Sequence, residues 1–303
     1  MKKILCVCLS STLQRTVSFQ SLVLTNVNRS EHYNYYASGK AINSARVLTQ
    51  LEKGSAISVC PIGQKNQQLF TELAARDDLE IRTVTIPGAT RECWTLLDRT
   101  AGTTTEIVVG EPEIDAPEEI NTAEIKLLKL INNAFDEVDG VLLAGSRPGI
   151  WHDDLYATIA GMAKDNGKFF LADYIGKDME KTLKTVVPDV IKINDEEFCK
   201  TFLGDVAVSE EELKSAITKK SGELGNIIIV TRGVKSTFAA KNGEFAECPT
   251  EKVVPLNTTA CGDSFNAGFI YEYLNNGDFV SALKKGTWCA ARNAELEAPG
   301  AIR

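Results

Sequence analysis

Apolar runs alternate with amphipathic stretches over the middle and the end of this chain. The pattern predicts strands at 138–144, 168–173, 190–193 and 226–231, a buried first strand near 4–9, and helices at about 153–166, 195–203 and 209–221. Near-continuous apolar strands separated by helices indicate a parallel sheet that is covered on both faces. The pattern therefore predicts an α/β fold of the doubly wound class.

Two stretches interrupt this alternation, at about 13–38 and 91–111, where strand-like residues follow one another without helices between them. The second contains two strands around a turn at 99–102, which is typical of a hairpin, and another hairpin is predicted around Asn242-Gly243. We expect the two stretches to form a small separate sheet that acts as a lid. No linker or internal repeat divides the chain, so we expect a single domain over 1–303 with the lid strands inserted in its core.

Composition narrows the class of partner. The 303 residues carry a formal net charge of −8, which argues against nucleic acid or an anionic membrane surface as the main partner. No apolar stretch reaches the roughly 18–20 residues of a membrane span. The eight cysteines have no C-x-x-C spacing and there are only two histidines, so no zinc site is expected. These features favour a cytoplasmic protein that acts on a small molecule.

The strongest chemical signal lies near the C-terminus, where a turn of small residues leads into a helix. Helix starts carry unpaired N–H groups and partial positive charge, and they hold anions such as phosphate. The small residues Ala260, Cys261 and Gly262 would let a ligand approach the backbone closely. Asp263 would then lie beside the anion, where it could accept a proton from a hydroxyl. An ordinary helix whose start is stabilised by Asp263 explains the same residues, and the residues alone leave both interpretations open.

The segment 257–268 resembles the second signature of the ribokinase-like (PfkB) carbohydrate kinases, D/N-T-x-G-x-G-D-S/A-F-x-A-G. The resemblance continues along most of the chain and is strongest to the 1-phosphofructokinase and tagatose-6-phosphate kinase branch. It implies a three-layer ribokinase-like fold with a small β-sheet lid, and an ATP- and Mg²⁺-dependent kinase. Asp263 would be the catalytic base and 260–262 the anion hole. Lids in this family sometimes pair, so a homodimer is possible.

A second signature, G-G-K-G-x-N, resembles the segment 38–43. By this resemblance Gly39 and Lys40 would bind the substrate, Lys40 facing an anionic group, and Asn43 would bind a sugar hydroxyl. Thr90-Arg91 resembles a T-R element whose arginine meets a substrate phosphate. Taken alone, Lys40 and Arg91 could equally be solvated surface cations. Together they imply a polyhydroxylated, anionic acceptor.

Further matches concern the nucleotide. Residues 194–197 resemble an N-x-x-E element, so Glu197 would organise Mg²⁺ indirectly, through water, although Asn194 and Glu197 also fit a capping box. Residues 231–236 resemble a T-x-G-x-x-G stretch in which Arg232 would add a phosphate contact. The helix at 281–296 would wall the adenine site. The nucleotide-binding residues implied are Lys192, Asn194, Thr231, Gly233 and Asn293.

Departures from the family pattern gather at the substrate end. Gln14 stands where the branch has an aspartate, and Ser10-Ser11 where it has Asn-Pro. Gln14 could still bind sugar hydroxyls, but without charge. Ala260 replaces a glycine and would be strained if its φ is positive. We therefore expect an acceptor other than fructose 1-phosphate or tagatose 6-phosphate. A non-catalytic sugar- or nucleotide-binding protein on the same fold, and a kinase of nucleosides or another small alcohol, are the alternatives.

Overall fold

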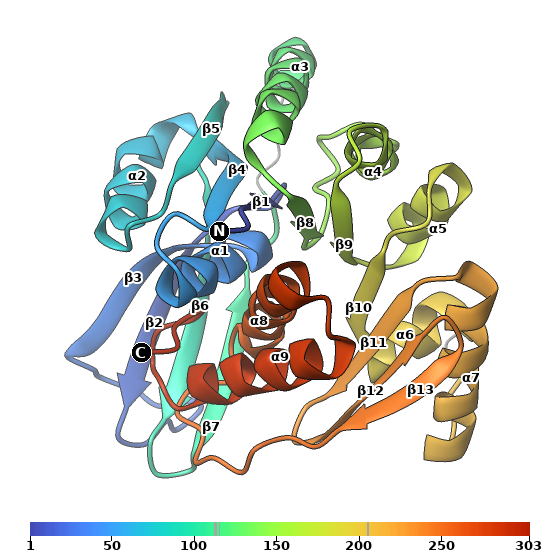
Figure 1. Cartoon of the computed structure of the whole chain (residues 1–303). Helices are drawn as coiled ribbons and strands as arrows, with labels where there is room; N and C mark the ends of the chain where they lie inside the picture. Colours follow the sequence, from blue (N-terminus) through green and yellow to red (C-terminus); the bar gives the residue numbers. More distant parts are fainter. Residues whose placement is uncertain (112–113, 115, 205) are drawn as a thin grey trace.

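A nine-stranded sheet forms the centre of the computed structural model, which describes residues 1–111, 114, 116–204 and 206–303 (Figure 1). The strands from β5 to β11 in the sheet run parallel, and β12 and β13 form an antiparallel hairpin at one edge. The order across the sheet is β13 (Glu244–Cys248), β12 (Lys235–Lys241), β11 (Ile227–Arg232), β10 (Val190–Asn194), β9 (Phe169–Asp173), β8 (Gly140–Ala144), β1 (Ile4–Val7), β4 (Ala56–Gly63) and β5 (Ile81–Ile86). The predicted parallel sheet is confirmed.

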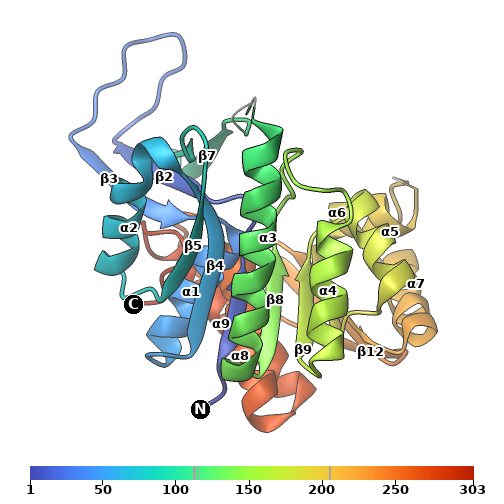
Figure 2. The same cartoon turned by 90° about the horizontal axis from the view of Figure 1, so that it is seen from above.

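Helices cover both faces of this sheet, and each layer packs its apolar side chains into a separate core (Figures 1 and 2). One face carries α3 (Pro117–Ala134), α4 (Leu155–Asp165), α5 (Gly176–Thr185), α6 (Asp195–Phe202) and α7 (Glu210–Leu224). The other carries α1 (Lys40–Leu51), α2 (Gln67–Arg76), α8 (Cys261–Asn276) and α9 (Phe279–Ala294). Short 3₁₀ turns occur at Gln64–Asn66 and Phe135–Glu137. The predicted three-layer, doubly wound α/β fold is confirmed.

A second, four-stranded sheet contains the two stretches that interrupt the α/β alternation. Its order is β3 (His32–Ser38), β2 (Thr12–Phe19), β6 (Arg91–Asp98) and β7 (Thr103–Val108). The central strand β2 pairs antiparallel with β3 and parallel with β6, while β6 and β7 form the predicted hairpin. The small sheet predicted from alternation is therefore confirmed.

The topology determines where a ligand site can form. From β1 the chain builds the sheet outward through β4 and β5 on one side, and then through β8, β9, β10 and β11 on the other. The strand order thus reverses beside β1, and ligands of open α/β sheets bind at the carboxyl ends of the strands near such a reversal. The small sheet leaves from the carboxyl end of β1, since β2 begins only five residues after β1 ends. No helix in the described residues is long and apolar enough to cross a membrane.

Two glycines hold α8 and α9 in close contact. A Cβ at Gly268 would lie 2.6 Å from the carbonyl oxygen of Lys285, and a Cβ at Gly286 would lie 3.0 Å from that of Phe265. The backbones of the two helices therefore approach more closely than any larger residue allows. Because α8 also packs on α1 and carries Asp263, this contact determines where the start of α8 lies.

We predict that Gly268→Ala lowers the free energy of unfolding by about 1–3 kcal/mol, because the added methyl group would collide with backbone and the helices would have to separate. Gly161 in α4 provides the control, since its Cβ would meet only the Thr185 side chain at an ordinary 3.6 Å. Gly161→Ala is expected to stabilise the protein by about 0.5–1 kcal/mol. Urea unfolding of both variants tests this, and equal effects would contradict it.

Candidate active site

Asp263 lies in the first turn of α8 and its side chain is buried. Asn43 Nδ2 donates a hydrogen bond of 2.9 Å to Asp263 Oδ2, and Ser44 Oγ donates one of 2.8 Å to its backbone oxygen. Both partners belong to the first turns of α1. The carboxylate is therefore fixed between two helix starts.

A buried carboxylate at the end of β9 organises the charges around this position. Asp173 Oδ2 accepts hydrogen bonds from Lys192 Nζ at 3.1 Å and Asn266 Nδ2 at 2.6 Å, while Oδ1 accepts one from Lys40 Nζ at 3.2 Å. Burial alone would raise the pKa of Asp173, but Lys192 and Lys40 outweigh it and hold that pKa well below its usual range. Asp173 in turn raises the pKa of Lys40, so the Lys40 ammonium group remains charged in the site.

The pKa of Asp263 moves in the opposite direction. Burial, reinforced by the neighbouring charge of Asp173, raises it to about 6, although Lys40, Asn43 and Lys192 oppose the shift. Two buried carboxylates on adjacent elements thus differ strongly in proton affinity. Such a pair is typical of a site where one carboxylate balances charge and the other exchanges a proton near neutral pH.

The turn before α8 adopts the strained conformation that the sequence left open. Ala260 is the N-cap of α8 and has φ 67°, in the left-handed region that favours glycine. Thr259 N–H donates to Asn257 Oδ1 at 2.9 Å, which anchors the turn. A Cβ at Gly262 would lie only 2.9 Å from Lys192 Nζ, so glycine is needed there for the ammonium to approach the helix start.

Cys261 and Asn293 hold this turn through their side chains. Burial raises the pKa of Cys261 to about 11, which keeps the thiol protonated, and its backbone N–H donates a long hydrogen bond of 3.4 Å to Thr258 O. Asn293 is fully buried; its Nδ2 donates to Thr259 O at 2.8 Å, and its Oδ1 accepts from Ser264 Oγ and from Gly300 N–H. Its amide therefore positions the turn and leaves no surface for a nucleotide, in place of the direct contact predicted from the sequence.

The predicted nucleotide residues lie at the carboxyl ends of two neighbouring strands. Asn194 of β10 is paired in register with Thr231 of β11, and Gly233 makes the following turn with φ 61°. Asn194 and Glu197 form the predicted capping box, with bonds of 2.7 and 2.9 Å. The remaining oxygen of Glu197 lies 3.9 Å from Lys40 Nζ, at the edge of the Asp173 cluster.

The phosphate contact predicted for Arg232 is wrong. Its side chain is buried, its guanidinium carbon lies 3.8 Å from the centre of the Phe238 ring, and it forms an ion pair with Glu210. Stacking on Phe238 of β12 uses one planar face of the guanidinium group, and pairing with Glu210 of α7 uses one edge. Its neighbour in the sequence, Thr231, retains the position at the strand end.

On the substrate side, the small sheet contacts the anion turn directly. Gln14 is buried and its Nε2 donates to Thr95 Oγ1 at 2.8 Å, which lies 3.3 Å from Thr259 Oγ1. Gly39 has φ 130°, and a Cβ there would lie 2.6 Å from Cys8 Sγ, so the chain can enter α1 only through glycine. The small sheet and the start of α1 therefore close over the position of Asp263.

Arg91 and Asn43, both predicted to bind the acceptor, are engaged within the protein. The Arg91 side chain is only 14% exposed and faces Glu111, which excludes a freely solvated cation. Asn43 Oδ1 accepts from Ser38 Oγ at 2.7 Å, and its Nδ2 donates to Asp263. Asn43 Oδ1 also accepts from Arg46 Nη1 at 3.1 Å, so the Asn43 amide is held by the protein and positions the Asp263 carboxylate.

Sequence reasoning missed three residues of this arrangement. Asp173 ends a predicted strand, and its place at the carboxyl end of a parallel strand could have indicated it. Asn266 lies at a variable position of the α8 signature, and Glu111 follows the small sheet without any motif. Their partners lie far away in the chain, so local patterns carry no signal for either.

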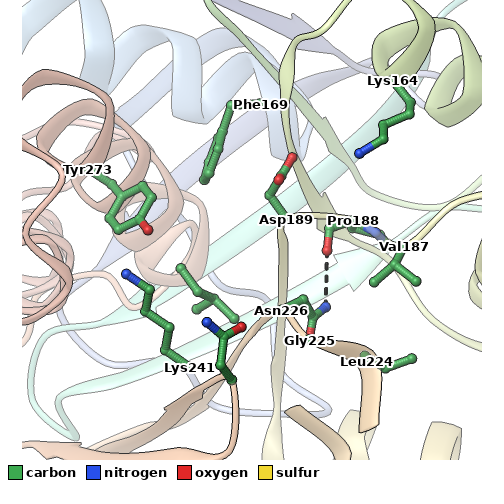
Figure 3. Close-up of a pocket in the computed structure, with 12 residues that line it drawn as sticks. Lys164, Phe169, Val187, Pro188, Asp189, Leu224, Gly225, Asn226, Lys241 and Tyr273 are labelled. Carbon is green, nitrogen blue, oxygen red and sulfur yellow. Dashed lines mark hydrogen bonds between the residues drawn. The ribbon is translucent and has the colours of Figure 1, made fainter. Parts of the chain in front are cut away.

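A separate pocket of about 400 Å³ lies beside the amino ends of the strands of the main sheet (Figure 3). Phe169 and Asp189 at the amino ends of β9 and β10, together with Lys241 and Tyr273, contribute to its wall. The groups around Asp263 and Asp173 lie at the carboxyl ends instead. The pocket is thus distinct from the candidate site. Among the described residues, no three His, Cys, Asp or Glu side chains form a group that could hold a metal ion by themselves.

We predict opposite tolerance for two substitutions at Ala260. Ala260→Gly is expected to change the free energy of unfolding by less than about 1 kcal/mol, because relief of the left-handed strain offsets the greater freedom of glycine when unfolded. Ala260→Val should lower it by about 1–3 kcal/mol, since a β-branched residue strongly disfavours φ 67°. Urea unfolding measures both; equal stability of the two variants would contradict the assigned conformation.

Comparison with known proteins agrees with this geometry. Three solved structures share the fold: a possible 1-phosphofructokinase from Thermotoga maritima (19% identity, 98% of this chain and 93% of that chain, TM-score 0.86), phosphofructokinase-2 from Escherichia coli in complex with fructose-6-phosphate (16%, 97% and 94%, 0.83), and ribokinase from Thermotoga maritima (21%, 99% and 95%, 0.71). Residues 3–301 match the pfkB family carbohydrate kinases. Because this match spans nearly the whole chain, the protein belongs to the PfkB family of carbohydrate kinases.

Proposed function

We propose that the protein is an ATP-dependent kinase that transfers the γ-phosphoryl group to a hydroxyl of a sugar or sugar phosphate, with Asp263 as the base. The observation that carries the proposal is the buried Asp263 carboxylate, with its pKa raised to about 6, at a helix start beside two ammonium groups. A base with a pKa near the working pH combines the deprotonated form with useful proton affinity. An ordinary helix cap needs neither the burial nor the lysine cluster.

The nucleotide would lie along the carboxyl ends of β10 and β11. Lys192 would face its phosphates, with Asn194, Thr231 and Gly233 forming the adjoining edge. The N–H groups of Gly262 and Asp263 in the first turn of α8 would receive the transferring phosphoryl group, since they have no partner within the helix, and Cys261 N–H could join them by releasing its long bond to Thr258 O. Phosphoryl transfer depends mainly on such positioning and charge neutralisation.

The residues present fit Mg²⁺ held indirectly. Asp173 already accepts three hydrogen bonds, whereas one oxygen of Glu197 remains beside Lys40 at 3.9 Å and could accept from a metal-bound water. Mg²⁺ commonly keeps several waters and takes its other ligands from the substrate phosphates. When bound, the ion would neutralise charge on those phosphates, while Glu197 fixes its water shell.

During transfer Asp263 would accept the proton of the acceptor hydroxyl at Oδ1, because Oδ2 is held by Asn43. Lys40 and Lys192, both held by Asp173, would offset the charge on the phosphoryl oxygens. Contacts between the small sheet and the turn at 258–259 would exclude water, which would otherwise compete with the acceptor.

We predict that Asp263→Asn lowers kcat by about 10²–10⁴-fold with little change in the KM for ATP, because the amide keeps the shape but cannot take the proton. In the wild type, kcat should fall about tenfold per pH unit below pH 6, where Asp263 becomes protonated, and level off above it. Asp153→Asn, at a carboxylate that is 76% exposed, is the control and should retain full activity. ADP formation is followed with a panel of sugars, sugar phosphates, nucleosides and small alcohols.

The same panel separates the alternatives. Turnover confined to nucleosides or simple alcohols would replace the sugar acceptor and leave the chemistry intact. Binding of sugar and nucleotide without any ADP formation, unchanged by Asp263→Asn, would instead support a non-catalytic binding protein. The raised pKa of Asp263 favours the kinase, because a binding protein gains nothing from a buried proton acceptor.

We further propose a homodimer formed through the outer face of the small sheet. Arg15 stacks there on Tyr35 at 4.0 Å and on Trp94 at 4.7 Å, and the neighbouring Tyr33 and Ile107 are 57% and 47% exposed. The strand register places Tyr35, Arg15, Trp94 and Ile107 in one row across this face. Aromatic residues with arginine are enriched where protein surfaces meet.

Light scattering is therefore expected to give twice the 33.0 kDa of one chain. Ile107→Lys should shift the protein toward the monomer, because the ammonium group would be buried in an apolar contact. Val234→Lys, at an exposed position in the turn between β11 and β12, is the matched control and should leave the mass unchanged. A wild-type monomer at micromolar concentration would refute the dimer.

A cytoplasmic location is part of the proposal. Burial raises the pKa of several thiols, including those of Cys6, Cys8 and Cys60, well above the ordinary value, so these cysteines remain protonated core residues. Unoxidised buried cysteines suit a reducing compartment. The small-molecule substrates of the proposed reaction are also available there.

A further inference from the structure

We propose that the acceptor of this kinase is an uncharged polyol, because the carboxylate of Glu111 occupies the position that the phosphate group of a phosphorylated acceptor would need beside Arg91. The inference rests on the proposed function and narrows its substrate class. It differs from the anionic acceptor expected from the sequence, which was based on Lys40 and Arg91 being available to a ligand.

The position of Arg91 makes it relevant to the acceptor. It begins β6, opposite Thr12 of β2, and alternation along β6 places it on the same face of the small sheet as Thr95. Thr95 bonds Gln14 and lies 3.3 Å from Thr259 in the anion turn. Arg91 therefore belongs to the inner face, which covers the position of Asp263.

Each of the three guanidinium nitrogens of Arg91 already faces a group of the protein. Nη2 donates to Ser10 Oγ at 2.6 Å and Nη1 to the carbonyl oxygen of Val109 at 3.1 Å. Nε lies 3.3 Å from Glu111 Oε1 but makes no well-aligned hydrogen bond, so Glu111 acts there mainly as a counter-charge. Ser10 Oγ also donates to the same Glu111 oxygen, which completes a closed triad.

The second predicted cation is balanced in the same way. Lys40 Nζ lies 3.2 Å from Asp173 Oδ1 and 3.9 Å from Glu197 Oε1. A phosphorylated acceptor would have to displace Glu111 from Arg91 or place its own negative charges beside that carboxylate. Like charges at such short range in a largely buried site are strongly disfavoured. The protein thus neutralises internally the two cations that would otherwise select an anion.

Along β2 the inner face carries neutral hydroxyl and amide groups, whereas the apolar Cys93 and Leu97 lie beside them on β6 and Glu106 of β7 lies opposite Thr95. Gln14, Thr16 and Ser18 alternate along β2, and Thr95 lies opposite Thr16. Each side chain is less than 9% exposed, and Thr16 Oγ1 has no hydrogen-bond partner in the protein. Hydroxyl and amide groups both donate and accept, which matches the hydroxyl groups of a polyol. An uncharged, hydroxyl-rich acceptor satisfies this surface without disturbing the Ser10–Arg91–Glu111 triad.

The test compares matched acceptors that differ by one phosphate group, such as a ketose or aldose and its phosphate ester. In the wild type, kcat/KM for ADP formation is expected to be at least tenfold higher with the uncharged member. Glu111→Gln keeps the side-chain shape but releases Arg91 from its counter-charge. It should raise kcat/KM for the phosphate ester at least tenfold and change that for the uncharged acceptor less than threefold.

Two further variants test whether the released Arg91 causes the gain with the phosphate ester. The double variant Glu111→Gln/Arg91→Met should lose the gain, since the released guanidinium would be what binds the phosphate. Glu92→Gln removes a carboxylate from the residue next to Arg91 on β6, but on the outer face beside Arg15, and it should leave the preference unchanged. Thermal unfolding of each variant distinguishes altered specificity from misfolding.

The outcomes separate this inference from the proposed function. A wild-type preference for the phosphate ester, or a Glu111→Gln variant with an unchanged ratio, overturns the inference while the kinase activity stands. If no acceptor yields ADP, the kinase is refuted, and calorimetric binding of the same matched pairs then tests the inference alone. Tighter binding of the phosphorylated member would overturn it, and tighter binding of the uncharged member would support it.

Discussion

The buried carboxylate of Asp173 is the interaction on which the candidate site depends. It joins three elements, since its partners Lys40, Lys192 and Asn266 belong to α1, β10 and α8. Removing one member of a buried charged group leaves the others uncompensated, which costs much more than the group contributes when intact. The cluster therefore couples the folding of both helix starts to the electrostatics of the site. It also keeps the Lys40 ammonium group charged in a place where burial alone would favour its neutral form.

The same cluster explains why the two nearby carboxylates behave differently. Asp173 has two ammonium groups in direct contact and stays ionised, whereas Asp263 has an amide partner, Asn43, and a negative neighbour. Positive charge is thereby concentrated where phosphate oxygens would lie, and proton affinity where a hydroxyl would lie. The close approach of α8 to α9 at Gly268 and the left-handed Ala260 place the helix start within reach of both.

Much of the fold and part of the site could be predicted from the sequence, and there is a physical reason why the rest could not. Continuous apolar strands such as Val190–Asn194 are local patterns that follow from burial. The hairpin whose turn ends at Gly102 is a local pattern that follows from turn geometry. The turn before Asp263 is equally local. The partner of a buried side chain cannot be predicted from a local pattern, because Asp173 bonds Lys40 over a separation of 133 residues. Motif resemblance placed Asn293 near the site, but only the structure reveals that its amide is used by the turn itself.

The internal pairs also determine what a ligand has to do. Arg91, Lys40 and Asn43 each bond a group of the protein that a bound ligand could in principle replace. Replacement carries unequal costs: displacing Glu111 from Arg91 would leave a carboxylate that is only 27% exposed beside an incoming negative charge, whereas a hydroxyl group brings no charge to this pair. The selectivity of such a site depends on the internal ion pairs that are costly to break. The charges retained around Asp263 can then serve the phosphoryl group in transfer, and the neutral inner face of the small sheet can serve the acceptor.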